Sequence, residues 1–175
     1  PHSTWVRLAL VRAQVRAGRL GDAETTLQRM KAVRDDNLTP QDDSYVSIAE
    51  AELELARGNP EASLAALDRV AGTPIEQRGP WNEWLVEART RAAMGDLEGA
   101  IAAYGSILHP TVLVDYSYPI ATFRIPIHYE LARVYEQAGR PSEARKHYLA
   151  YLDCWGNTDR PVPNADDARA RLRAL

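Results

Sequence analysis

The chain is poor in cysteine and has no long apolar run, and each deficit excludes a class of protein. Its single cysteine, Cys154, cannot form an internal disulfide, and no cluster of cysteine and histidine has the spacing of a zinc finger. No apolar run approaches the roughly 20 residues that span a bilayer, and the amino terminus lacks the apolar region of a signal peptide. We therefore expect no membrane insertion and no metal site.

Surplus positive charge and catalytic motifs are also missing. Nineteen of the 21 basic residues are arginine, but 24 acidic residues leave a formal net charge of -3, which gives no general attraction to nucleic acid. The sequence contains no nucleophile elbow, no glycine-rich phosphate loop before a lysine and no zinc-binding histidine–glutamate helix. We expect a non-catalytic chain without a cofactor or a nucleic-acid partner.

What the chain does contain is a short motif that occurs four times. A glycine is followed five residues later by a small residue, and four residues after that by an apolar or aromatic one. The copies are Gly18–Ala23–Leu27, Gly58–Ser63–Leu67, Gly95–Ala100–Tyr104 and Gly139–Ala144–Tyr148. Each glycine ends one amphipathic pattern and begins another, so the repeated unit is a helix, a tight turn and an antiparallel helix. Such repetition is typical of a helical solenoid.

Capping residues and prolines predict where the helices begin. Thr39 with Pro40, then Pro60, Pro80 and Pro126, each stand at the start of an apolar helical pattern. We predict one all-α domain over residues 1–175, with repeat units at about 3–33, 40–70, 80–108 and 124–155. A last helix at 164–175 caps the stack, with Asn164 as its cap and Arg169, Arg171 and Arg173 facing outward.

The fourth unit resembles the tetratricopeptide repeat. The positions that match that family's pattern are Leu131, Ala132, Tyr135, Gly139, Ala144 and Tyr148, while His128 stands where a tryptophan is usual. The third unit keeps Trp84, Ala88, Gly95, Ala100 and Tyr104. The repeated glycines lie 40, 37 and 44 residues apart, against a family period of about 34, so these are divergent repeats with long connections.

The resemblance implies a right-handed superhelical solenoid of about four helix-turn-helix repeats with a C-terminal capping helix. It also implies a non-catalytic scaffold for protein–protein interaction. The chain looks, more weakly, like the C-terminal repeat segments of bacterial signalling proteins, and it begins at Pro1 without an initiator methionine. We therefore expect a module of a larger bacterial protein, cytoplasmic by default, whose upstream part is free to hold a targeting signal.

The repeat register predicts a groove lined by the first helix of each pair. Arg12, Glu52, Arg89 and Arg133 share one groove position, and the groove residues that we predict to bind an acidic peptide are Arg12, Arg16, Arg89, Arg133, Trp5, Tyr45 and Tyr129. The alternative is that the arginines pair with glutamates on the same surface, namely Glu52, Glu83, Glu87, Glu130 or Glu136.

The connection at 109–124 is too apolar for a free surface loop. It either folds over its own repeats or forms a docking patch of Val112, Leu113, Val114, Tyr116, Tyr118 and Phe123. Two other functions remain open. One is a self-associating structural protein that forms an oligomer or filament through the solenoid ends and this segment; the other is a regulatory arm of a kinase, cyclase or transcription regulator.

Overall fold

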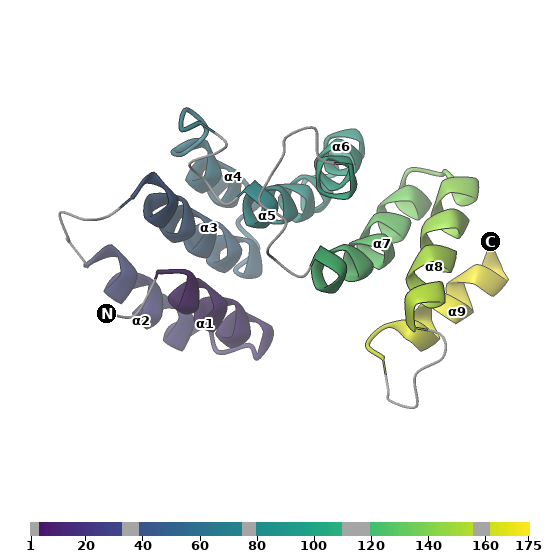
Figure 1. The fold of residues 1–175 in the computed structure, drawn as a ribbon, viewed down its shortest axis with the longest axis horizontal. Helices are drawn as coiled ribbons and strands as arrows, with labels where there is room; N and C mark the ends of the chain where they lie inside the picture. Colours follow the sequence, from purple (N-terminus) through teal and green to yellow (C-terminus); the bar gives the residue numbers. More distant parts are fainter. Residues whose placement is uncertain (1–3, 33–38, 75–79, 110–119, 156–161) are drawn as a thin grey trace. The chain divides into compact units, whose positions relative to one another are not determined.

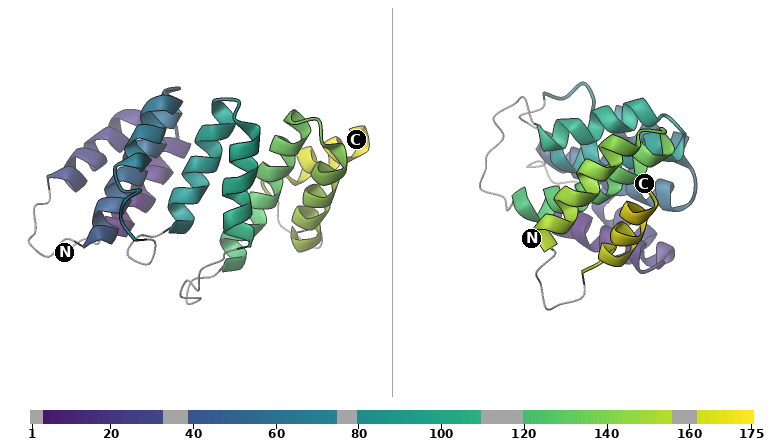
Figure 2. Two further views of the ribbon diagram at one scale, coloured as in Figure 1. Left: turned by 90° about the horizontal axis from the view of Figure 1, so that it is seen from above. Right: turned by 90° about the vertical axis from the view of Figure 1, so that its right-hand side faces the viewer.

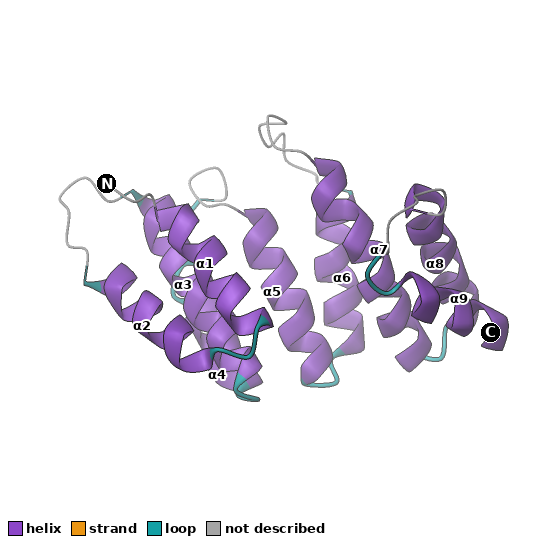
Figure 3. Cartoon of the chain, turned by 90° about the horizontal axis from the view of Figure 1, so that it is seen from below, coloured by secondary structure: helices purple, strands orange, loops and turns teal. Residues whose placement is uncertain are grey.

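The computed structural model describes residues 4–32, 39–74, 80–109, 120–155 and 162–175. Within these ranges the backbone forms helices and no strand (Figures 1 and 3). The helices are α1 (Thr4–Arg16), α2 (Leu20–Lys31), α3 (Pro40–Ala56), α4 (Pro60–Asp68), α5 (Pro80–Ala93), α6 (Leu97–Leu108), α7 (Ile120–Gln137), α8 (Pro141–Trp155) and α9 (Ala165–Ala174). The predicted all-α fold of helical repeats is confirmed.

The four repeated glycines occupy the tight turns. All four have positive φ, with values of 71° at Gly18, 80° at Gly58, 81° at Gly95 and 67° at Gly139. A β-carbon built on any of them meets no atom within 4 Å, so the requirement for glycine is conformational and not spatial. The motif read from the sequence is thus a helix-ending turn, repeated four times.

Helix starts follow the predicted signals, with one exception. Thr39 and Asp42 form a reciprocal capping box ahead of α3, and Pro40, Pro60 and Pro80 are first residues of their helices. The helix predicted to begin at Pro126 begins instead at Ile120 and keeps that proline inside. Proline removes one backbone hydrogen bond, which weakens a helix without obliging it to end.

The chain divides into two compact units, Pro1–Gly95 and Asp96–Leu175. The division passes between α5 and α6, inside the predicted third repeat at 80–108. The expectation of a single domain over 1–175 therefore stays a prediction.

Unit 1 has an aliphatic core shared by α1 to α5. Twelve buried side chains form it: Leu8, Val11, Ala23, Leu27, Met30, Ile48, Ala49, Ala51, Leu53, Ala66, Leu67 and Val86. A fully buried polar contact lies beside it, a hydrogen bond of 2.8 Å between the hydroxyls of Ser63 in α4 and Thr90 in α5. Because both hydroxyls are buried, this bond aligns α4 and α5 in a defined register.

Unit 2 is built around tyrosines. Tyr129 of α7 and Tyr148 and Tyr151 of α8 are buried together with Ala144, Ala165 and Ala168. Figure 2 shows α9, in yellow, beside the α7–α8 pair. Buried Ala168 and partly buried Leu172 hold α9 there, as predicted for a capping helix.

Two details of α9 differ from the prediction. Asn164 precedes the helix in a left-handed conformation, with φ of 62°, and its side chain makes no capping hydrogen bond. Arg171 does not face outward: it donates to Glu136 of α7 at 2.8 Å and to Asp167 at 2.6 Å. The Arg171 guanidinium turns back because two carboxylates lie within its reach.

Candidate partner-binding surface

Arg12 lies where the first helices of unit 1 meet. From α1 its Nε donates to Glu52 of α3 and its Nη1 to Asn82 of α5, both at 2.5 Å. The Arg12 and Glu52 side chains are only 14% and 10% exposed. Charge-assisted hydrogen bonds are among the stronger polar contacts in proteins, so Arg12 links α1 to both α3 and α5.

The alternative interpretation, that the arginines pair with glutamates, is confirmed for three of the glutamates it named. Arg12 pairs with Glu52, Arg91 with Glu87 at 2.8 Å and Arg171 with Glu136 at 2.8 Å. Glu130 accepts the hydroxyl of Tyr104 at 2.8 Å. Much of the arginine content therefore serves internal contacts.

The other predicted residues of unit 1 differ in exposure. Trp5 is 52% exposed and Arg16 is exposed, both on α1. Tyr45 of α3 is partly buried and packs against the aliphatic core, and Arg89 of α5 is partly buried. Trp5 and Arg16 are thus the members of this set that offer most surface to a partner.

In unit 2 the two predicted residues have opposite environments. Tyr129 is buried, and its hydroxyl donates to Asp167 at 2.6 Å. Burial, followed by the neighbouring Asp167 carboxylate, raises the pKa of Tyr129, whereas Arg133 on the next turn is exposed. Tyr129 therefore packs inside the unit, and Arg133 remains accessible.

The structure does not test the predicted docking patch. Val112, Leu113, Val114, Tyr116 and Tyr118 lie outside the described residues, as does the side chain of Phe123. The patch stays a prediction.

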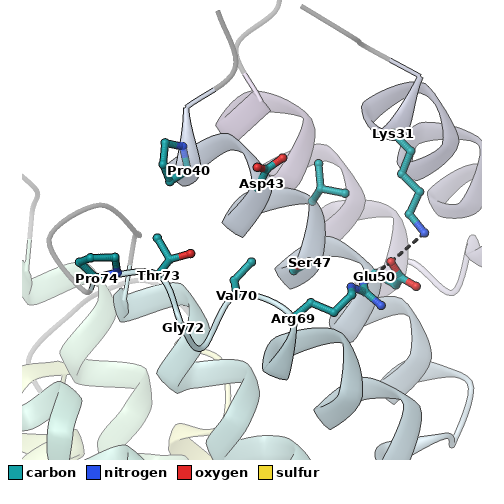
Figure 4. A pocket seen from close by; sticks show the side chains of 11 residues that line it. Lys31, Pro40, Asp43, Ser47, Glu50, Arg69, Val70, Gly72, Thr73 and Pro74 are labelled. Atoms are coloured by element: carbon teal, nitrogen blue, oxygen red, sulfur yellow. Dashed lines mark hydrogen bonds and ion pairs between the residues drawn. The ribbon is translucent and has the colours of Figure 1, made fainter. Parts of the chain in front are cut away.

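A hollow of about 730 Å³ between α2, α3 and the end of α4 was not foreseen from the sequence. Figure 4 shows Glu50 at one side of it, between Lys31 and Arg69, and its carboxylate accepts from Lys31 at 2.7 Å and from Arg69 at 2.6 Å. Residues of α2, of α3 and of the segment that follows α4 converge here with no shared motif, so no sequence signal pointed to it. Charges of both signs line it, and Glu50 pairs with both Lys31 and Arg69.

His128 and His147 meet within the α7–α8 pair. Their Nδ1 atoms are 2.8 Å apart, the rings stack at 5.1 Å, and Tyr135 stacks on the other side of His147 at 5.4 Å. No group of three potential metal-ligating side chains forms among the residues that the structure describes. Burial, reinforced by the nearby His128, His109 and Lys146, lowers the pKa of His147 to about 4.

This histidine pair makes the fold acid-sensitive. A histidine takes up a proton near pH 6.5 in the unfolded chain, but His147 does so only near pH 4 in the fold. Stability is therefore lost as the pH falls from 6.5 to 4, by about 1–2 kcal/mol once solvent screening of this partly exposed group is allowed for. Urea unfolding at several pH values measures the loss.

The control for this effect is His147→Phe, which keeps a ring against Tyr135 but cannot titrate. Carboxylates also titrate below pH 5, so the informative quantity is the wild-type loss minus the variant's loss. Equal losses in the two proteins would show that the pair has no part in acid sensitivity.

Comparison with known proteins adds a family assignment. The family model described as tetratricopeptide repeat matches residues 4–29, 45–69 and 126–148. These segments lie on α1–α2, α3–α4 and α7–α8, so each match covers one helical pair. No curated protein and no solved structure matches the chain.

Among the described residues, no helix is both long and apolar enough to cross a membrane. The helical pairs, their glycine turns and the three family matches agree on one assignment. The chain carries tetratricopeptide repeats, which serve as protein-interaction modules.

Proposed function

We propose that the protein is a non-catalytic scaffold that binds an acidic segment of a partner protein on the first-helix surface of unit 1. The observation that carries this proposal is the placement of exposed Trp5 and Arg16 on α1, the same helix that Arg12 links to Glu52 and Asn82. A rigid helix that presents a tryptophan and an arginine has the composition of a binding hot spot.

The contacts divide into two kinds. Trp5 and Tyr45 supply apolar area, and Arg16 and Arg89 supply cationic hydrogen-bond donors for carboxylates. Arg12 contributes indirectly, because its buried guanidinium holds the first helices in register. In unit 2, exposed Arg133 offers a further cationic contact, while buried Tyr129 supports the helix beneath it.

A display library of random 12-residue peptides, selected on the full chain, tests the proposal. We expect enrichment of peptides that carry net negative charge and at least one apolar residue. Trp5→Ala and Arg16→Glu should each weaken the best peptide by about tenfold, equivalent to ~1.4 kcal/mol. Fluorescence anisotropy with a labelled peptide measures the affinity.

A matched control is Arg145→Glu, which reverses an exposed arginine on α8 in unit 2. This variant should bind the peptide like the wild type. Selection of basic or neutral peptides would contradict the proposed acidic partner. Equal weakening by Arg145→Glu and Arg16→Glu would contradict the assigned surface and would indicate only general charge attraction.

A further inference from the structure

One side of α1 is apolar and open to solvent. Val6 is 43% exposed and Leu10 is 47% exposed, and Ala13 and Ala17 continue the same stripe at helical spacing and are also exposed. The opposite side of α1 buries Leu8 and Val11 in the core of unit 1. Of the six exposed large apolar side chains among the described residues, three belong to α1, so exposed apolar surface is concentrated there.

The repeat itself shows what this stripe is built to contact. Its four positions lie 12, 8, 5 and 1 residues before the turn glycine Gly18. The same positions before Gly58 are Val46, Glu50, Leu53 and Arg57 of the second pair. There they face α2: Glu50 pairs with Lys31 at 2.7 Å, Arg57 pairs with Glu24 at 2.6 Å, and Leu53 is fully buried.

The first helix of the third pair, α5, makes a contact of the same kind at one stripe position. Thr90 stands five residues before Gly95, the position that Ala13 holds in α1, and it is fully buried and bonded to Ser63 of α4. Glu50 and Arg57 of the second pair, and Thr90 of α5, thus contact the second helix of the preceding pair. In α1 the equivalent stripe is wholly apolar and exposed. It therefore has the composition of a helix-packing surface, and no helix among the described residues covers it.

We propose that this stripe packs against the same stripe of a second copy of the chain, with the two α1 helices antiparallel. A two-fold axis near residues 11 and 12 places Val6 of one copy opposite Ala17 of the other, and Leu10 opposite Ala13. Every large side chain then meets a small one, which lets the helix axes approach closely. Such self-complementarity is what an isologous interface requires.

The charges beside the stripe are compatible with this arrangement. The stripe itself carries no charged residue, so the antiparallel contact buries no charge. Arg7, on one flank, donates to the Arg29 carbonyl of its own copy at 3.2 Å. A single helix face is smaller than a standard interface, so the dimer should be weak and concentration-dependent.

Sedimentation equilibrium of the full chain from about 1 to 500 μM tests for the dimer, a range that brackets the weak affinities expected of a small interface. We expect the mass to rise from 19.5 kDa toward twice that value. Leu10→Glu should hold the mass at the monomer throughout. The matched control is Leu149→Glu, which changes an apolar side chain on α8 that is 52% exposed, and it should still dimerise.

Cross-linking tests the antiparallel register in a Cys154→Ser background, which removes the free thiol. Copies with Val6→Cys, mixed with copies with Ala17→Cys, should form a disulfide-linked dimer under mild oxidation. Val6→Cys alone should not, because antiparallel helices hold the two positions about 16 Å apart along the axis. A constant monomer mass, association that Leu10→Glu leaves intact, or preferred linkage of position 6 to itself would each overturn the proposal.

Discussion

Replacing Arg12 with alanine should lower the free energy of unfolding by about 3–5 kcal/mol. The Glu52 carboxylate, 10% exposed, would lose the guanidinium that pairs with it at 2.5 Å, and Asn82 would lose the donor to its side-chain oxygen. Removing one partner of a largely buried pair leaves a charge that neither water nor protein solvates. The loss should exceed that of any surface ion pair in the chain.

Urea unfolding of two further variants gives this prediction its controls. Arg12→Met combined with Glu52→Met removes both charges and should recover most of the loss, since an apolar pair of similar size needs no counter-charge. Arg19→Ala removes a surface pair with Asp22 whose side chains are 65% and 50% exposed, and it should change stability by about 0–1 kcal/mol. A loss of stability for Arg12→Ala no larger than that for Arg19→Ala would show that the Arg12 contacts do not stabilise the packing of the first helices.

Tyr148→Ala should destabilise unit 2 by about 3–5 kcal/mol, the usual cost of removing a buried aromatic ring. Tyr148 is fully buried, lies 6.0 Å from the ring of Tyr129 and donates to Glu136 at 2.6 Å. Its loss leaves a cavity between α7 and α8 at the place where α9 closes the unit. Thermal unfolding followed by circular dichroism measures the shift.

Tyr148→Phe separates ring packing from the hydrogen bond. Glu136 keeps Arg171 as a donor at 2.8 Å, so this variant should lose only about 1 kcal/mol. If the phenylalanine variant were as unstable as the alanine variant, the stabilisation would come from the hydroxyl, and the packing argument for the tyrosine cluster would be wrong.

Much of the fold was predictable because its signals are local. The turn glycines need positive φ, the capping residues bond within one helical turn, and prolines at first helical positions remove no bond. The helix starting at Ile120 instead of Pro126 shows the limit of such rules, since one unfavourable residue does not decide a helix by itself.

The candidate site was predictable only in part. The register correctly placed Arg12 next to Glu52, because residues one repeat apart fall on neighbouring first helices. It did not show that the contact with Glu52 would leave Arg12 largely buried, that Tyr129 would be buried, or that Arg171 would turn inward to Glu136. The direction a long side chain takes depends on partners from other helices.

The glycine-terminated helical pairs of the tetratricopeptide type follow from the amino-acid sequence alone, since every signal for them acts within a few residues. The packed fold was needed to show which arginines make internal contacts, which ring stacks on His147, and which face of α1 is exposed. Those outcomes depend on contacts between residues far apart in the chain, such as Arg12 with Asn82, whose meeting follows from the packing of several helices at once.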